Sequence, residues 1–156
     1  MTRKNFKKDL ILNKRALFDY EILEKFDAGI ALLGAEVKSL KQGRASLTGA
    51  YVVIKNREAY LLNTTIPPYQ PQNISSNYDP LRTRKLLLKQ KEINYLFAKN
   101  KERGLTLIPL KVYNINGLIK IEIGLAKGKK KFDKREVLKK REIKRNIEKT
   151  KLEFRV

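Results

Sequence analysis

The chain has 156 residues, of which 42% are hydrophobic, and this length and composition are typical of one domain with a core of its own. Its 36 Lys and Arg residues outnumber 16 Asp and Glu residues, which gives a formal net charge of +20 and indicates a polyanionic partner. The sequence contains neither Cys nor His, so it excludes disulfides, thiol and imidazole catalysis, and the usual zinc sites.

No segment has the composition of a membrane span or a secretory signal. The N-terminal apolar run, residues 10–12, is too short for the core of a signal peptide, and uncharged stretches such as residues 60–78 contain polar residues and proline. We therefore expect a soluble, cytoplasmic protein that does not bind a membrane.

The groups that remain available for catalysis form no recognisable motif. No pair of carboxylates stands out, and the segment GLAKGKKK lacks the GxxxxGK[ST] spacing of a phosphate-binding loop. We expect no enzymatic activity, no metal and no cofactor.

The first third of the chain is expected to contain a basic arm, β-structure and a short helix. Residues 1–12 are assigned to the arm, because the basic residues there show no clean periodicity; it is expected to be partly ordered at its end. Alternation over residues 20–26, an Asp-Ala-Gly turn and an apolar run over residues 30–33 predict a hairpin or one bent strand. Residues 34–42 predict a short helix that ends at Gly43.

The middle of the chain is expected to contain a hairpin, a loop and a long helix. Residues 51–55 and 59–63 are rich in β-branched and aromatic residues and predict the hairpin. Residues 64–80 contain four prolines and predict an irregular loop, because proline fixes φ and removes a hydrogen-bond donor. The spacing of apolar residues predicts a helix over residues 82–103, ended by Gly104.

Two further strands are expected over residues 105–113 and 118–125, on either side of a turn with Asn-Gly chemistry at residues 114–117. In the second strand Ile and Leu alternate with Lys, Glu and Gly, as in an antiparallel sheet with one wet face. The short strands and the helices together predict a mainly β fold. We expect a small, closed or nearly closed antiparallel β-barrel over residues 13–126, with helices packed outside.

Residues 127–156 form a basic tail, with 14 basic and five acidic residues and few apolar ones. Helix propensity is high, but the apolar stripe is too weak to dock firmly on a barrel. We expect the tail to be disordered in the free protein and helical on contact with a polyanion. The alternative is an ordinary solvated helix that lies on the domain.

Basic residues cluster at residues 3–15, 82–91 and 127–151. Three clusters on one small domain favour nucleic-acid binding, since each Lys or Arg set against a phosphate releases condensed counterions. The alternative is that these runs only solvate the surface. A basic barrel with Tyr and Phe on its surface favours single-stranded or folded RNA, whose bases stack on rings.

Several strings of the sequence occur in an order that resembles a known family. These strings are LNKRALFDYEILEKFDAGIALLGAEVKSLKQGRASL, DPLRTRKLLL, GLTLIPLKVY and IGLAKGKKKFDKRE, and they span residues 12–136. They closely resemble the small protein B family, the bacterial SsrA-binding proteins. The resemblance implies an oligonucleotide-binding-type barrel with flanking helices and a basic C-terminal tail, in a monomer without catalytic activity.

The resemblance also implies a function, trans-translation. Members of the family hold the tRNA-like part of transfer-messenger RNA and take it to a stalled ribosome, where the tail enters the decoding centre and the empty messenger channel. The ribosome and an elongation factor carrying the aminoacylated RNA are therefore implied partners. A general basic RNA-binding protein or a structural ribosomal protein is the alternative, which explains the charge and the tail but not the specific strings.

Family roles are carried over only at matching positions. The resemblance implies RNA contact for Asn13, Asp27, Leu87 and Lys120 in the barrel, and for Lys127, Gly128, Lys129 and Lys130 at the start of the tail. It implies contact with the decoding centre for Phe132, Asp133, Lys134 and Arg135.

These positions differ in the role that the sequence implies. The lysines would neutralise phosphate and Gly128 would allow close approach or a bend, whereas Leu87 would support the surface or belong to a helix core. Asp27 replaces a commoner Glu, and Phe132 replaces a commoner His or Tyr, which keeps the ring but not its hydrogen bond. The terminal LEFRV is an apolar anchor or simply the end of the chain.

Overall fold

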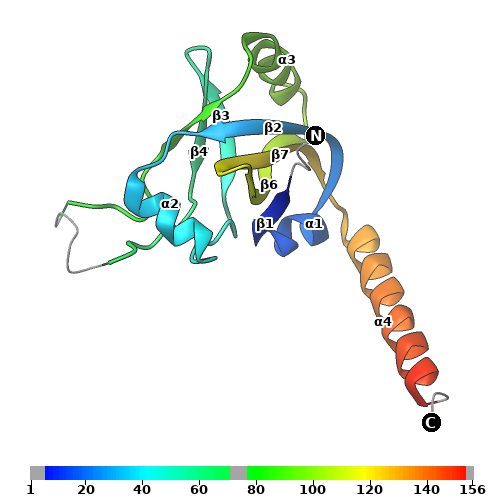
Figure 1. Cartoon of the computed structure of the whole chain (residues 1–156). Helices are drawn as coiled ribbons and strands as arrows, with labels where there is room; N and C mark the ends of the chain where they lie inside the picture. Colours follow the sequence, from blue (N-terminus) through cyan, green and yellow to red (C-terminus); the bar gives the residue numbers. More distant parts are fainter. Residues whose placement is uncertain (1–5, 71–76, 154–156) are drawn as a thin grey trace, which may run out of the picture.

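The computed structural model describes residues 6–70 and 77–153 (Figure 1). Side chains are described throughout these ranges except at residues 131 and 132. The elements in chain order are β1 (Lys7–Leu12), α1 (Lys14–Asp19), β2 (Tyr20–Ile30), α2 (Gly34–Lys41), β3 (Tyr51–Lys55), β4 (Glu58–Leu62), β5 (Arg84–Leu87), α3 (Gln90–Asn100), β6 (Leu105–Ile115), β7 (Leu118–Gly128) and α4 (Lys131–Glu153).

The strands form one antiparallel sheet of seven, in the order β1-β6-β3-β4-β5-β2-β7. Strands β6 and β7, which stand at the two ends of the series β6-β3-β4-β5-β2-β7, also pair with each other. Each of these six strands therefore has a partner on both sides. β1 is added to the second half of β6, where Leu12 lies opposite Lys111.

The main core lies on the inner side of this sheet and is made by alternate residues of the strands. Its fully buried aliphatic side chains include Leu61, Leu86, Leu107, Ile121 and Ile123. Leu40 of α2 and Leu96 of α3 complete it, so both helices pack against the core through a few apolar residues. The mainly β fold with flanking helices was predicted correctly.

The hairpin predicted over residues 51–63 from its β-branched and aromatic runs and the one predicted over residues 105–125 from its turn chemistry are both confirmed. β3 and β4 pair around Asn56-Arg57, and β6 and β7 pair around Asn116-Gly117; all four turn residues have positive φ. Such φ values match the twist of the flanking strands in two-residue hairpins. The helix over residues 34–42 is also confirmed as α2, followed by Gly43 at φ +71°.

The outer side of β7 is wet over only part of its length. At the C-terminal end of β7 this side is covered by a second, smaller apolar cluster beneath α1, made up of Ala16, Ile108, Leu110 and Ala126. Bulges between Ile22 and Glu24 in β2 and between Pro109 and Lys111 in β6 accompany this change of cover, because a bulge bends a strand and re-aims its side chains.

Three local predictions differ from the structure. The second half of the expected basic arm is strand β1, whose Ile11 is buried in the core, so one alternating apolar position outweighs the charges around it. For residues 20–33 the hairpin alternative is wrong and the bent-strand alternative is confirmed, since residues 20–30 form one strand whose Ala28 is buried within a ladder to β7.

The third difference is the predicted helix over residues 82–103, whose first part is strand β5. Arg84 and Leu86 are buried and Lys85 and Leu87 are exposed, which is the period of a strand. The apolar run at residues 86–88 hides this alternation in the sequence, and the helix begins only at Gln90.

Helix α4 extends away from the rest of the molecule (Figure 1). The N-terminal part of α4 contacts α1 of the body. Further along the helix, apolar side chains such as Leu138, Ile143 and Ile147 are exposed. The helical tendency of this segment is therefore as expected, whereas disorder of the tail in the free protein stays a prediction. No helix in the described residues combines the length and apolar character needed to cross a membrane.

Candidate nucleic-acid interface

The neighbouring strands β1, β6, β7 and β2 share a polar outer face. Cross-strand partners place eight polar side chains on it: Lys7 and Asp9 of β1, Lys111 and Tyr113 of β6, Lys120 and Glu122 of β7, and Lys25 and Asp27 of β2. Lys111 bridges Asp9 at 3.4 Å and Glu122 at 3.5 Å. Because the strands are paired along their length, these groups are held on a stiff surface.

Tyr113 lies at the centre of this outer face. Its hydroxyl donates a hydrogen bond of 2.7 Å to Oδ1 of Asp27, and the Lys7 ammonium lies 4.0 Å from the centre of its ring. Only 3% of Tyr113 is exposed, although it points away from the main core. Burial first, and the Asp27 carboxylate second, raise the pKa of Tyr113 above its ordinary value of 10.0, so the hydroxyl stays a donor at neutral pH.

The register brings three of the predicted RNA-binding residues together on this face. Lys120 lies opposite Gly29, which lies opposite Leu87 on β5, and Asp27 lies two residues before Gly29. Leu87 is 57% exposed. The alternative that Leu87 belongs to the core of a helix is wrong, because it is the outward residue of a strand.

Asn13 is placed differently from the other predicted contacts. It is buried at the N-terminus of α1, where Oδ1 accepts a hydrogen bond from the Ala16 N–H at 3.1 Å. Its Nδ2 donates to the carbonyl oxygens of Pro109 at 2.8 Å and Leu47 at 3.3 Å. The amide thus caps α1 and ties it to two other segments, and RNA contact by Asn13 stays a prediction.

The four predicted contacts at the start of the tail lie at the end of β7 opposite to its turn. Lys127, Gly128 and Lys130 are exposed. Lys129 donates from its backbone N–H to the carbonyl oxygen of Asp19 at 2.9 Å and from Nζ to the carbonyl oxygen of Leu17 at 3.1 Å. This segment therefore presents cations while it is attached to α1.

Asp19 fixes the first turns of α4. Its carboxylate pairs with Lys134 Nζ at 3.2 Å and with Arg15 Nε at 3.1 Å. Burial alone would raise the pKa of Asp19, but the hydrogen bonds and charges of Lys134 and Arg15 outweigh it and lower the pKa below its ordinary value of 3.8. The Arg141 guanidinium lies 5.6 Å from the Phe18 ring and adds a second contact between the helices.

The predicted decoding-centre residues lie in the first turns of α4. Asp133 and Arg135 are exposed, and an oxygen of the Asp133 carboxylate accepts a hydrogen bond from the Lys130 N–H at 3.3 Å. Lys134 is occupied with Asp19. The side chain of Phe132 lies outside the described residues, as does most of LEFRV.

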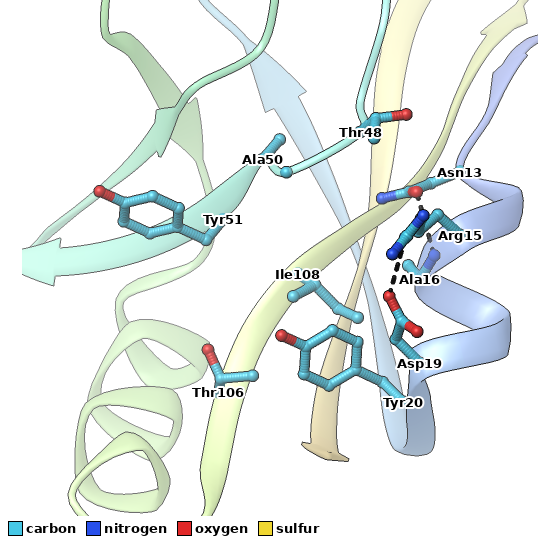
Figure 2. A pocket seen from close by; sticks show the side chains of 11 residues that line it. Asn13, Arg15, Ala16, Asp19, Tyr20, Thr48, Ala50, Tyr51, Thr106 and Ile108 are labelled. Atoms are coloured by element: carbon cyan, nitrogen blue, oxygen red, sulfur yellow. Dashed lines mark hydrogen bonds and ion pairs between the residues drawn. The ribbon is translucent and has the colours of Figure 1, made fainter. Parts of the chain in front are cut away.

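A pocket of about 370 Å³ lies between α1, the start of β3 and β6 (Figure 2). Tyr20, Tyr51 and Thr106 line it together with the Arg15–Asp19 ion pair. No motif in the sequence indicated this pocket, because its lining comes from segments that only the fold brings together.

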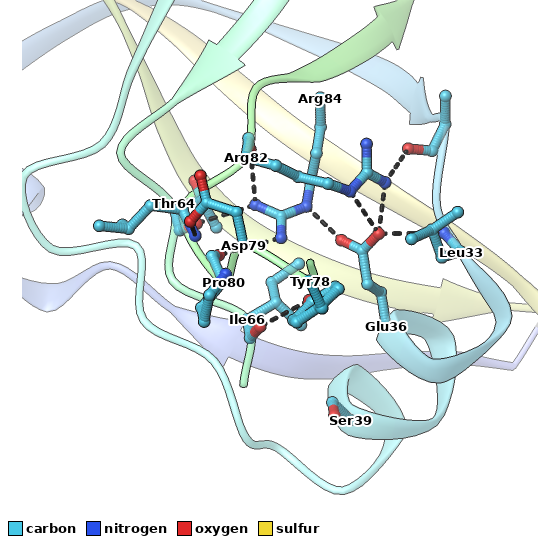
Figure 3. Close-up of polar contacts among 12 residues, drawn as sticks. Leu33, Glu36, Ser39, Thr64, Ile66, Tyr78, Asp79, Pro80, Arg82 and Arg84 are labelled. Carbon is cyan, nitrogen blue, oxygen red and sulfur yellow. Dashed lines mark hydrogen bonds and ion pairs between the residues drawn. The ribbon is translucent and has the colours of Figure 1, made fainter. Parts of the chain in front are cut away.

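Sequence reasoning also missed a buried ion network, which lies between α2 and the start of β5 (Figure 3). The Glu36 carboxylate accepts hydrogen bonds from Arg82 and Arg84, and both Glu36 and Arg84 are 0% exposed. Arg84 also donates to the carbonyl oxygens of Thr64 at 2.8 Å and Pro80 at 3.0 Å. Two cations of the basic cluster at residues 82–91 therefore stabilise the fold. Fewer cations of this cluster are available to a partner than the sequence suggested.

Known proteins similar to this chain extend over most of its length. A family model described as SmpB protein matches residues 10–153. The SsrA-binding protein of Sulfurihydrogenibium sp. (strain YO3AOP1) is 53% identical over 138 residues, which make up 88% of this chain and 90% of that protein. The SsrA-binding protein of Thermosipho africanus (strain TCF52B) is 53% identical over 141 residues, which make up 90% of this chain and 94% of that protein.

A solved structure is similar as well. This structure is described as "tmRNA-SmpB: a journey to the center of the bacterial ribosome". It matches this chain with a TM-score of 0.65 and 46% sequence identity. The match covers 81% of this chain and 92% of the other.

Proposed function

Because the chain belongs to the SmpB family, we propose that it binds the tRNA-like domain of transfer-messenger RNA and delivers it to stalled ribosomes in trans-translation. The observation that carries this proposal is the outer face, where Asp27, Leu87 and Lys120 converge on neighbouring strands. A rigid sheet that presents cations, an acceptor and an exposed apolar side chain suits folded RNA, which is recognised by its shape and its unpaired bases.

The finer architecture is part of the proposal. The ring of pairings from β6 through β3, β4, β5 and β2 to β7 supports a closed barrel of the oligonucleotide-binding type. We assign RNA binding to this body and a separate role to residues 127–156, which extend from it as a basic helix. The ordered strand β1 supports a shorter N-terminal arm than residues 1–12.

The tail is proposed to act on the ribosome. The exposed cations around residues 127–130 suit the phosphates of ribosomal RNA, and the first turns of α4, with Phe132, Asp133, Lys134 and Arg135, are assigned to the decoding centre. The rest of the helix then occupies the messenger channel. An elongation factor that carries the aminoacylated RNA completes the assembly, and the protein acts in the cytoplasm as a monomer without catalysis of its own.

Removal of the tail tests this division. A chain that ends at Lys130 keeps the Lys129–Asp19 contact and all strands, so we expect unchanged folding and most of the RNA affinity. Release of stalled ribosomes in a reconstituted translation system should be lost. Normal rescue by the shortened chain would show that the tail has been assigned the wrong role.

The net charge of +20 also favours a second function, general RNA binding. A competition gel-shift at moderate salt separates the two functions: specific binding predicts that the tRNA-like RNA displaces an arbitrary hairpin of equal length. Similar affinity for both RNAs would favour the general RNA-binding protein.

A further inference from the structure

A groove of about 270 Å³ lies between α3 and the turn that joins β3 to β4, at one end of the molecule (Figure 1). It is lined by Ile54, Asn56, Arg57, Ile93, Asn94 and Phe97. Ile54 packs against the main core from the same side of β3 as Val52, and Ile93 is buried under α3. The groove therefore opens at an end of the core, and not on the outer face that carries Asp27 and Lys120.

An exposed aromatic ring forms one wall of this groove. Phe97 is 45% exposed, although it lies on a helix that packs against the core. The Lys101 ammonium lies 4.1 Å from the centre of its ring but does not line the groove. Ile54 and Ile93 complete the apolar surface. A ring beside aliphatic side chains offers one planar group a place to stack.

The rim of the groove consists of hydrogen-bond donors without acidic groups. The side chains of Asn56 and Arg57 are exposed and make no hydrogen bond or ion pair with the other described residues. Oδ1 of Asn94 accepts a hydrogen bond from Gln90 Nε2 at 3.1 Å, which leaves its amide nitrogen as a donor. No Asp or Glu of the described segments lines the groove. The rim thus complements an anion, and a guanidinium suits phosphate in particular.

The backbone at Arg57 indicates that its side chain has a role outside the fold. Arg57 has φ +60° in a two-residue turn, where glycine is preferred because it carries no Cβ. The arginine makes this turn less favourable and gains no contact with the described part of the protein in return. Residues held in such conformations are frequent at ligand sites.

An unstacked nucleotide has the properties that this groove complements. It combines a flat base, acceptors on the edge of the base and a phosphate. A peptide that adds a strand would need an open sheet edge, which a turn and a helix do not offer. The net charge of +20 also favours nucleic acid over a protein partner.

We propose that this groove binds one unstacked base of ribosomal RNA, with the base against Phe97 and its phosphate at Arg57. This inference rests on the proposed function, in which the outer face holds transfer-messenger RNA. Because the groove opens in another direction, a second RNA occupies it, and the ribosome supplies that RNA.

Two substitutions test the binding energy of the site. Phe97→Leu keeps an apolar contact but removes the ring, so the complex of the full chain with transfer-messenger RNA should bind stalled ribosomes about tenfold more weakly. Arg57→Gly should weaken this binding about threefold while the melting temperature stays unchanged or rises, because glycine suits the turn. The affinity for the free tRNA-like domain should not change in either variant.

A matched pair of variants separates the site from net charge. Lys55 lies on the same hairpin as Arg57, but it points to the opposite side of β3 from Ile54 and does not line the groove. Arg57→Gln and Lys55→Gln remove the same charge. We expect only Arg57→Gln to weaken ribosome binding. Equal losses would mean that the hairpin acts through its charge alone, and would overturn the proposal.

Directed cleavage identifies the RNA. The chain has no cysteine, so Ala98→Cys provides a single attachment point for an iron chelate beside Phe97, and Ala98 is exposed. On stalled ribosomes, hydroxyl radicals from this chelate should cleave a short segment of ribosomal RNA. One base in that segment should be protected from base-specific reagents by the wild type and reactive with Phe97→Leu.

The outcomes distinguish this site from the proposed function. Cleavage of transfer-messenger RNA alone, or crosslinking of the same position to a ribosomal protein alone, would overturn the assignment to ribosomal RNA. Normal rescue without any ribosomal base whose reactivity depends on Phe97 would overturn the site and leave the function standing. Failure of the wild-type complex to release stalled ribosomes would overturn the proposed function and this inference with it.

Discussion

The buried network of Glu36, Arg82 and Arg84 makes the substitution Glu36→Gln informative. Glu36 and Arg84 are both 0% exposed, whereas the side chain of Arg82 is 29% exposed. The substitution keeps the shape of the side chain but removes its charge. Arg84 then remains in the interior without an anion, while Arg82 can turn toward water.

The cost follows from this burial. Removal of one partner from a buried ion pair destabilises a protein by about 3–5 kcal/mol, because the other charge stays desolvated and unpaired. The total stability of a domain is about 5–15 kcal/mol, so Glu36→Gln should remove a large share of it. The double variant Glu36→Leu, Arg84→Met should recover part of the loss. It leaves the carbonyl oxygens of Thr64, Arg82 and Pro80 without the Arg84 donor, and the buried Thr64 carbonyl alone accounts for a remaining cost of about 1–3 kcal/mol.

Urea unfolding followed by circular dichroism measures these changes, provided that the slope of the transition is unchanged. Glu58→Gln is the matched control, since Glu58 pairs with Lys85 on the surface at 41% and 46% exposure and should show no measurable change. A Glu36→Gln chain that unfolds at nearly the wild-type urea concentration would refute the reasoning, because it would mean that the interior tolerates the unpaired guanidinium.

Three further predictions concern the interface. Asn13→Ala should lower the free energy of unfolding by about 1–2 kcal/mol in urea, because it removes a helix cap and two tethers; loss of RNA binding at unchanged stability would instead show direct contact. Asp19→Asn should speed amide hydrogen exchange at residues 129–135 at neutral pH. Since the folded-state pKa of Asp19 is lowered, the wild type should lose the same protection only as the pH falls below 3.8, and equal exchange in both chains at neutral pH would contradict this. Replacement of Lys127, Lys129 and Lys130 by Gln should reduce the slope of log affinity against log salt by about 2–3, and an unchanged slope would exclude phosphate contact by these lysines.

Sequence patterns predicted the parts of the fold that depend on local chemistry. The Asn-Gly turn, the glycine after α2 and the alternation along β7 each specify their structure within a few residues. The start of β5 was missed because its identity depends on a distant partner. Arg84 is buried only because Glu36, 48 residues away, neutralises it, and no local rule favours a buried arginine.

In the candidate site, too, the sequence indicated some of the residues, whereas their common location depends on distant partners in the fold. The resemblance indicated Asp27, Lys120 and Leu87, but their common location follows from pairings of β2 with β7 and β5 that the sequence does not specify. Tyr113 was not singled out, since a lone Tyr on a strand is ordinary until its hydroxyl is seen to bind a carboxylate on another strand. Conversely, Asn13 is a polar residue of the kind that contacts a partner at a protein surface. Only the fold shows that both its amide oxygen and its amide nitrogen are hydrogen-bonded within the protein.

Strand β7 connects the two regions that are proposed to bind RNA. Lys120 and Lys127 lie on this one strand, seven residues apart, which corresponds to about 24 Å of extended chain. Ladders to β6 on one side and β2 on the other run along this whole interval, so the distance does not depend on a loop. Helix α4 then begins three residues after β7 ends, where Asp19 holds its first turns. RNA that binds beside Lys120, as proposed, would therefore fix the position from which the tail projects relative to that RNA, because the pairing of β7 is rigid over this interval.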